Sequence, residues 1–499
     1  MEHDDCAPLP RPDGMDQVRV RFAPNGEVAY AAFFTRTILY TWLFARRYGG
    51  AFVLRLDDTD LDRQIPGALD SYGEGMRWLG LDWDEGPEVG GDFGPYRQSQ
   101  RRHLYREAVE KLLDEGKAYH CYCDRERLDE LAARSRRREG GRPYDGRCRD
   151  LSAASRRAAI ASGIVPSVRL RVPDDGEIVS HDMIRGDVVV KADRLNDYVI
   201  SRPDGWPTYH LTVVVDDSQM RISHVLRGSE GVANMAPQAV MHDALGLPRP
   251  MYLHFPLVRA GDFGLNEQFL PTGVGIYLDE LRRGGYLPQA VINYYAMLGQ
   301  GYPGDVDIRS LDQLIEHFDY RRISRKDIIE QDRDKLEWMN RRYLQQAAPD
   351  ADVAAILADR IAADLTVSAR TAHSVLARAL HTVRTRIAAA PDGTELLRFA
   401  FAPAPRPEPG MFPAEQADRV GAVLLRCAAV LEDGGRLGPV LAAAAAEGGP
   451  DRGALTRCAI TALTGGRERL GPDDIAGILG PHEAARRLRR AGAILEARV

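Results

Sequence analysis

Arginine and aspartate side chains stand near the ends of two predicted strands in residues 17–60, QVRVRFAPNGEVAYAAFFTRTILYTWLFARRYGGAFVLRLDDTD. Apolar residues alternate with Arg19 and Arg21, which predicts the first strand, and the apolar run before Asp57 predicts the second. The residues between them carry apolar side chains at helical spacing and end in a glycine pair. A strand–helix–strand unit needs a parallel sheet, and ligands bind where such strands end. A guanidinium placed there suits a carboxylate, to which it donates two parallel hydrogen bonds.

The composition restricts the class of protein. The chain has 499 residues, 28% of them charged, and a net charge of −6, which is typical of a soluble multidomain protein. Mild acidity confines any nucleic-acid-binding face to a local basic patch. We see no apolar run of the roughly 18 residues that a membrane helix needs, and no apolar signal core in MEHDDCAPLP. Six cysteines do not make a disulfide framework in so long a chain. We therefore expect a cytoplasmic protein with no membrane partner.

Several segments resemble the glutamyl-tRNA synthetases, which are class I aminoacyl-tRNA synthetases. The segments RFAP and WLFARRYGGAFVLRLDDTD look like the first half of that catalytic domain, and DYVISRPDGWPTYHLTVVVDD, HFPLVR and KLEWMNRRYL match later patterns in order. The resemblance is specific up to Leu344 and looser after it. It implies an α/β fold: a Rossmann-type catalytic domain with an inserted acceptor-binding domain, followed by all-α stem-contact and anticodon-binding domains.

The resemblance also implies domain boundaries. We expect a disordered lead-in over 1–16, a catalytic domain over 17–98 and 208–258, an inserted acceptor-stem-binding domain over 99–207, a helical stem-contact domain over 259–346, and an α-helical anticodon-binding-like region over 347–499.

The resemblance implies a pocket for glutamate. Arg21 and Arg227 would bind the side-chain carboxylate, and Tyr209 would line the same pocket. Asp57 stands where the family has a glutamate that binds the ammonium group, and Asn25 stands where it has a serine. Without the family pattern, the two arginines would be ordinary surface residues of strands.

Both ATP-binding signatures of the family are missing, although their flanks remain. The family's His-Ile-Gly-Gly, which contacts ATP at a helix N-terminus, falls on AAFF at residues 31–34. The second signature, close to KLSKR, falls on QFLPT at residues 268–272, and no lysine occurs between Arg259 and Pro288. Removing one group that stabilises transition-state charge typically costs roughly 10²–10³ in rate. We therefore expect ATP-dependent adenylation to be lost; a misaligned, tolerant loop is the alternative.

Three cysteines have the spacing of zinc ligands in some members of the family: Cys121, Cys123 and Cys148. The family's fourth ligand falls on Asp150, and His120 is the alternative. Zinc accepts three thiolates with one oxygen or nitrogen, and closed tetrahedral sites are structural. The resemblance therefore implies a structural zinc, against the alternative of three free cytosolic cysteines.

Arginines are concentrated within the inserted segment. They are Arg134, Arg136, Arg137, Arg138, Arg142, Arg147 and Arg149. Phosphate contacts need such local charge, although a charge run is often only a solvated face. Because the run lies beside the segment that resembles the acceptor-stem binder, we expect Arg142, Arg147 and Arg149 to bind tRNA.

Together these features favour a glutamyl-tRNA synthetase-like protein that binds charged tRNA(Glu). We expect it to pass the glutamyl group to an unknown small-molecule or peptide acceptor, since an aminoacyl ester is already activated and needs no ATP. The alternatives are a noncatalytic tRNA-binding pseudo-synthetase and a glutamate–tRNA ligase with a rewired ATP site. The residues do not fix a general base; by resemblance, Glu230, Asp58 and His210 lie near the pocket.

Overall fold

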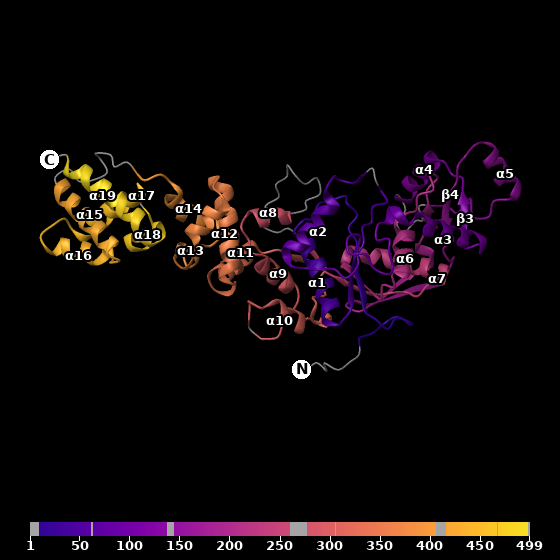
Figure 1. The fold of residues 1–499 in the computed structure, drawn as a ribbon. Helices are drawn as coiled ribbons and strands as arrows, with labels where there is room; N and C mark the ends of the chain where they lie inside the picture. Colours follow the sequence, from indigo (N-terminus) through magenta and orange to yellow (C-terminus); the bar gives the residue numbers. More distant parts are fainter. Residues whose placement is uncertain are drawn as a thin grey trace. The chain divides into compact units, whose positions relative to one another are not determined.

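The computed structural model describes residues 9–60, 63–136, 144–259, 277–304, 306–405, 416–466 and 468–497 (Figure 1). The chain forms two compact units. The first comprises Met1–Asp279 and Ile292–Arg333, and the second Glu280–Val291 and Asp334–Val499. Within the described ranges, no helix is both long and apolar enough to cross a membrane.

The first unit is built on a strand–helix–strand element. Strand β1 (Arg19–Phe22) pairs in parallel with β2 (Ala51–Leu54), and helix α1 (Phe34–Arg47) connects them. The connection packs closely, because a Cβ at Gly50 would lie 2.5 Å from the Val18 carbonyl oxygen. A glycine is therefore required where the helix returns to the sheet.

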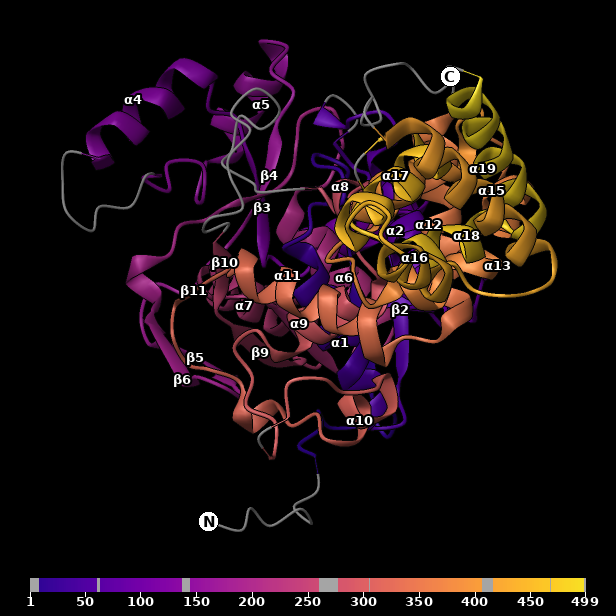
Figure 2. The ribbon, with the colours of Figure 1, turned by 90° about the vertical axis from the view of Figure 1, so that its left-hand side faces the viewer.

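Strand β1 is joined to a second group of strands in the order β6-β5-β9-β8. The Arg19 amide donates to Ser223 Oγ at 2.8 Å, and the Ser223 amide donates to the Arg19 carbonyl at 2.9 Å. Strand β8 is parallel to β9, whereas β5 and β6 form an antiparallel hairpin, which Figure 2 shows. The bounds are β5 Glu177–Asp182, β6 Gly186–Lys191, β8 His224–Gly228 and β9 Met251–Phe255.

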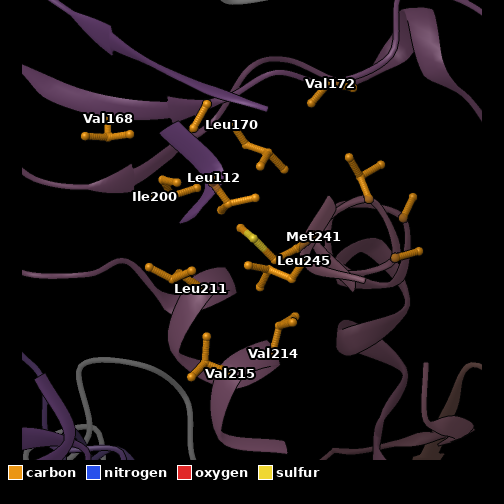
Figure 3. Close-up of a cluster of buried hydrophobic side chains, with 14 of the residues drawn as sticks. Leu112, Val168, Leu170, Val172, Ile200, Leu211, Val214, Val215, Met241 and Leu245 are labelled. Atoms are coloured by element: carbon orange, nitrogen blue, oxygen red, sulfur yellow. The ribbon is translucent and has the colours of Figure 1, made fainter. Parts of the chain in front are cut away.

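The inserted segment contributes a three-stranded sheet that shares its core with two helices of the first unit. Leu112, Leu170, Leu211 and Met241 are each 0% exposed and meet in this core (Figure 3). Full burial of such a side chain stabilises the fold by roughly 1.5–3 kcal/mol. The elements are α3 (Arg102–Asp114), β3 (Ala118–Cys121), β4 (Ser167–Leu170), β7 (Val199–Ser201), α6 (Tyr209–Gln219) and α7 (Met235–Leu245).

The remaining helices and strands before residue 349 are short. They are α2 (Ala68–Leu79), α4 (Arg125–Arg136), α5 (Ala153–Ala161), β10 (Leu257–Arg259), α8 (Leu278–Arg283), α9 (Pro288–Met297), α10 (Leu311–Glu316), β11 (Ile328–Glu330) and α11 (Arg333–Arg342).

From residue 350 onward, every element of the described chain is helical, as the sequence predicted. Gly421 and Gly492 let two of these helices approach closely, because a Cβ at either residue would lie within 3.1 Å of the other residue's carbonyl oxygen. The helices are α12 (Asp350–Leu365), α13 (Ala369–Arg384), α14 (Ala390–Phe401), α15 (Ala417–Glu432), α16 (Leu437–Ala446), α17 (Arg452–Thr464), α18 (Pro472–Leu479) and α19 (Pro481–Glu496).

The expected lead-in differs in part from the structure. Of residues 1–16, the structure describes 9–16, and these pack against the first unit. The Pro10 carbonyl accepts a hydrogen bond from His224 Nε2 at 2.9 Å, and Met15 is only 8% exposed. This hydrogen bond ties the described part of the lead-in to the start of β8.

Candidate functional site

Two strands of the first unit carry the arginines that we expected to bind a carboxylate. Arg21 lies on β1, where its Nε and Nη2 donate to the Asp217 carboxylate at 3.1–3.3 Å. Arg227 lies on β8, where its Nε donates to His254 Nε2 at 2.8 Å and its Nη2 donates to Gln238 Oε1 at 3.1 Å. Arg227 Nη1 is buried and has no hydrogen-bond partner among the described residues. A buried donor without a partner is costly, so this nitrogen is suited to an acceptor from a ligand.

The ring of Tyr252 on β9 lies beside Arg227 and within the electrostatic influence of Arg21. The Arg227 guanidinium carbon lies 5.4 Å from the ring centroid. Burial raises the pKa of Tyr252 to about 12, and the charges of Arg227, Asp217 and Arg21 all act on it. The name arginine pocket stands below for Tyr252 together with residues that the sequence predicted to bind glutamate, namely Arg21, Asp57, Tyr209 and Arg227.

A chain of buried charges holds Asp57 at the arginine pocket. Arg55 is 0% exposed; its Nε donates to Asp57 Oδ1 at 2.8 Å, and its Nη1 donates to Asp217 Oδ1 at 2.6 Å. Burial raises the pKa of Asp57 to about 6, against the opposing charge of Arg55. Burial also acts to raise the pKa of Asp217, but the charges of Arg21 and Arg55 outweigh it and lower that pKa to about 2. Of Asp57 and Asp217, Asp57 therefore has the higher pKa and gains a proton first as the pH falls.

The other predicted residues of the pocket are more open. Tyr209 is the first residue of α6 and is 49% exposed. Asn25 is exposed, and its Oδ1 accepts a hydrogen bond from the Glu27 amide at 3.2 Å. Neither side chain contacts Arg21 or Arg227 through a hydrogen bond in the described part of the chain.

The three residues considered as a general base differ in whether their side-chain atoms are already engaged in hydrogen bonds. Asp58 accepts hydrogen bonds from the Ser99 amide at 2.8 Å and from Ser99 Oγ at 2.9 Å, so both its oxygens are engaged. Glu230 has its carboxylate against the backbone of Gly228. Burial lowers the pKa of His210 to about 4, and His210 Nδ1 is buried without a hydrogen-bond partner in the described chain. His210 therefore offers a neutral imidazole beside the arginine pocket.

Aromatic side chains pair at and just before the start of α1, the position that corresponds by resemblance to the first ATP-binding signature. Phe33 and Phe34 have ring centroids 4.2 Å apart, and Tyr30 stacks on Tyr72 at 5.1 Å. The amides of Phe34 and of the next residue donate to carbonyls three positions back, at 3.0 Å each, so the first turn satisfies them internally. Ala31 is fully buried. The counterpart of the second signature, residues 268–272, lies outside the described residues.

The three expected cysteine ligands meet at the end of β3. The sulfur atoms of Cys121, Cys123 and Cys148 all lie within 4.8 Å of one another. Three soft thiols at this separation suit zinc. Asp150 does not join this group; it is exposed, and its Oδ1 lies 3.3 Å from the Arg171 guanidinium nitrogens.

His120 is also outside the cysteine cluster as the structure describes it. The oxygen at the cluster is Tyr144 Oη, which lies 3.5 Å from Cys121 Sγ and accepts a hydrogen bond from the Cys148 amide at 3.2 Å. Sequence reasoning missed this tyrosine. Its signal was its place four residues before Cys148, within the segment RPYDGRCR.

The arginines expected to bind tRNA have different surroundings. Arg149 is committed to the fold, because it pairs with Asp197 at 2.8 Å and with Asp174 at 2.5 Å. Arg147 is exposed. Arg142 lies outside the described residues, as do Arg137 and Arg138.

Comparison with known proteins identifies the family to which the chain is similar. The pattern of the family "tRNA synthetases class I (E and Q), catalytic domain" matches residues 17–338. The glutamate–tRNA ligase of Moorella thermoacetica is 44% identical over 340 residues, which are 67% of this chain and 68% of that protein. The corresponding ligase of Heliobacterium modesticaldum is 42% identical over 342 residues, 68% of each chain.

Two solved structures extend the likeness to nearly the whole chain. The glutamate–tRNA synthetase of Elizabethkingia anophelis has a TM-score of 0.74 at 29% identity and covers 96% of this chain and 100% of its own. A glutamate–tRNA ligase from Elizabethkingia meningosepticum, solved in complex with its amino acid, has a TM-score of 0.75 at 27% identity with the same coverage. The expected fold, a Rossmann-like α/β core with a helical C-terminal region, is confirmed. The chain belongs to the glutamyl-tRNA synthetase family of class I tRNA synthetases.

Proposed function

We propose that this chain binds tRNA(Glu) and transfers the glutamyl group of glutamyl-tRNA to an acceptor, without making glutamyl-adenylate. One contrast carries the proposal. The arginine pocket keeps a buried guanidinium nitrogen with no partner among the described residues, whereas paired aromatic rings lie at and just before the start of α1. Relatives named as glutamate–tRNA ligases support tRNA(Glu) as the RNA.

The start of α1 supports the loss of adenylation. A helix N-terminus binds phosphate through free amides, but the amides of Phe34 and of the next residue are engaged at 3.0 Å. The side chain of Ala31 has no hydrogen-bond donor, and Phe33 stands where the family has a glycine. Groups that stabilise developing phosphate charge are each worth roughly 10²–10³ in rate, so the loss of several should abolish adenylation.

The transfer needs no ATP. An amine or hydroxyl of the acceptor attacks the ester carbonyl carbon; the bond to the acceptor forms while the bond to the ribose oxygen breaks. The acceptor's proton ends on the ribose oxygen, so no electrons are exchanged with another reagent. Arg21 and Arg227 bind the side-chain carboxylate, Asp57 binds the ammonium group, and the neutral His210 is a candidate to carry the proton.

We also propose that the cysteine cluster holds one structural zinc. Cys121, Cys123 and Cys148 supply three thiolates, and Tyr144 Oη lies 3.5 Å from Cys121 Sγ. A metal there would tie the end of β3 to the segment that carries Cys148, and would supply only structural chemistry.

The proposal is tested by binding and by turnover. Using a tRNA whose glutamate is joined through a stable amide, we expect the charged form to bind about 10-fold more tightly than uncharged tRNA, since a hydrogen-bonded charged contact is worth about 1.5–3 kcal/mol before desolvation. Arg227→Ala should erase this preference. Ester-linked glutamyl-tRNA should then transfer labelled glutamate to candidate amines with ATP omitted. Equal affinities for the two forms would favour the noncatalytic pseudo-synthetase.

A further inference from the structure

Arg227 is held by a row of buried side chains that ends in a carboxylate. Asp182, at the end of β5, and His254, on β9, are both 0% exposed. His254 Nδ1 lies 2.7 Å from Asp182 Oδ2, and Arg227 Nε lies 2.8 Å from His254 Nε2. We propose that Asp182 and His254 are positioning residues that fix the Arg227 guanidinium for a glutamyl carboxylate. This inference rests on the proposed use of glutamyl-tRNA.

The hydrogen bonds allow one arrangement of protons. Arg227 Nε can only donate, so His254 Nε2 must accept, and the imidazole proton must sit on Nδ1 and point at Asp182. Asp182 is itself fixed, because it accepts from the amides of Ile184 at 2.9 Å, Arg185 at 2.7 Å and His254 at 3.0 Å. Burial lowers the pKa of His254 despite its hydrogen bond to Asp182. The imidazole is therefore neutral and can accept.

The consequence is an arginine that keeps its charge. Arg21 pairs directly with the Asp217 carboxylate, which Arg55 also contacts, so a carboxylate already faces the Arg21 guanidinium. Among the described residues, the acceptors of Arg227 are neutral: the His254 imidazole, the Gly231 carbonyl at 3.0 Å and the Gln238 amide oxygen at 3.1 Å. Asp182, the carboxylate that ends this row of side chains, reaches Arg227 only through the imidazole. An uncompensated guanidinium favours a carboxylate over the neutral amide of a glutaminyl group.

Gly231 leaves the space that this arrangement needs. A Cβ there would lie 2.3 Å from Arg227 Nε and 2.9 Å from His254 Nε2. No side chain fits at position 231 while the hydrogen bond between Arg227 and His254 is kept. The bare backbone of Gly231, the His254 imidazole and the Asp182 carboxylate therefore together orient the Arg227 guanidinium.

The test compares two substitutions of one residue. His254→Gln keeps a donor for Asp182 and an acceptor for Arg227, whereas His254→Leu removes both. Binding is measured to amide-linked glutamyl-tRNA, amide-linked glutaminyl-tRNA and uncharged tRNA. We expect the wild type and His254→Gln to prefer the glutamyl form about 10-fold over the other two, and His254→Leu to show no preference. A full preference in His254→Leu would overturn the proposal.

A matched control is available on β8. His224 is also 0% exposed, and it is held by Ser223 Oγ at 2.8 Å and by the Pro10 carbonyl, not by Arg227. His224→Leu should keep the preference ratio even if its stability falls. Loss of the ratio in His224→Leu would show that any buried histidine matters and would overturn the specific role of His254.

A second readout separates this inference from the proposed function. In protein labelled with ¹⁵N-histidine, the His254 resonances, assigned with His254→Gln, should report a neutral ring protonated at Nδ1 at pH 7, and Asp182→Asn should disturb that tautomer. A ring protonated at Nε2 would overturn the arrangement even if glutamyl-tRNA is preferred. If the wild type bound glutamyl-tRNA no more tightly than uncharged tRNA, the proposed function and the role of Asp182 and His254 in selecting glutamate would both be overturned. The tautomer of His254 would still show whether Arg227, His254 and Asp182 are hydrogen-bonded as proposed.

Discussion

The two arginines of the arginine pocket donate to different kinds of acceptor. Arg21 donates to Asp217 across 196 residues of sequence, whereas Arg227 donates to neutral acceptors. The residue types and their places on strands were predictable, because alternation with apolar residues marks a strand. The acceptors were not, because Asp217 and His254 come from elements that only the folded sheet brings near. Arg227 therefore keeps a buried nitrogen without a partner among the described residues, whereas Arg21 already pairs with Asp217.

At the residue scale, binding should depend on pH through Asp57. Its raised pKa, about 6, means that it gains a proton as the pH falls below 6, and a neutral carboxyl no longer attracts an ammonium group. We expect the preference for amide-linked glutamyl-tRNA to fall several-fold between pH 7 and pH 5 when binding is titrated at constant salt. Asp57→Asn should show a weak preference at both pH values. A preference that is independent of pH in the wild type would contradict the assigned role.

At the element scale, the helix expected between the first two strands begins only at Phe34, twelve residues after β1 ends. The apolar spacing was read correctly, but Ala31 forms an isolated bridge with Tyr277, which keeps the preceding residues out of the helix. Periodicity reports which face of a helix is buried and does not report a pairing with a residue so distant in sequence. The same limit applies to Arg149, whose partners Asp174 and Asp197 could not be read from the arginine run.

The packing of Tyr30, one of the aromatic residues just before α1, can be tested by a substitution on helix α2. A Cβ at Gly75 would lie 2.4 Å from Tyr30 Cδ1, so Gly75→Ala should displace the Tyr30 ring and lower the free energy of unfolding by roughly 1–3 kcal/mol. Gly73→Ala in the same helix is the control. Its Cβ would meet Arg77 Nη1 at 3.4 Å, an ordinary contact, and alanine favours the helix by up to about 1 kcal/mol. Urea unfolding measures both, and equal effects would speak against tight packing of Tyr30.

The cysteine cluster gives a second prediction at the element scale. Elemental analysis of protein purified without added metal should find one zinc per chain, and Cys121→Ala should lose it. Because the binding free energy of a structural metal adds to folding, the variant should unfold at a lower temperature. Cys427→Ala, which removes a buried cysteine outside the cluster, is the control and should keep its zinc. A well-folded wild type that contains no metal would show that the cysteine cluster is not a zinc site.

At the scale of the whole molecule, the order of motifs along the chain was enough to predict the fold, because family patterns recur from residue 17 to residue 338. It was not enough to place the fourth ligand at the cysteines, since Asp150 turns to Arg171 while Tyr144 lies at the cluster. The likeness to glutamate–tRNA ligases and the aromatic cover of α1 point to different sources of activated glutamate. The source of that glutamate is the central question for the molecule.

One measurement addresses this question directly. Glutamate-dependent exchange of labelled pyrophosphate into ATP, with tRNA(Glu) present, reports adenylation itself. We expect no exchange above the background without enzyme, because the start of α1 offers no free amide at Phe34 and no cationic side chain at Ala31. The glutamate–tRNA ligase of Moorella thermoacetica, assayed in parallel, serves as the positive control. Robust exchange by this chain would contradict the account and identify it as a ligase with a rewired ATP site.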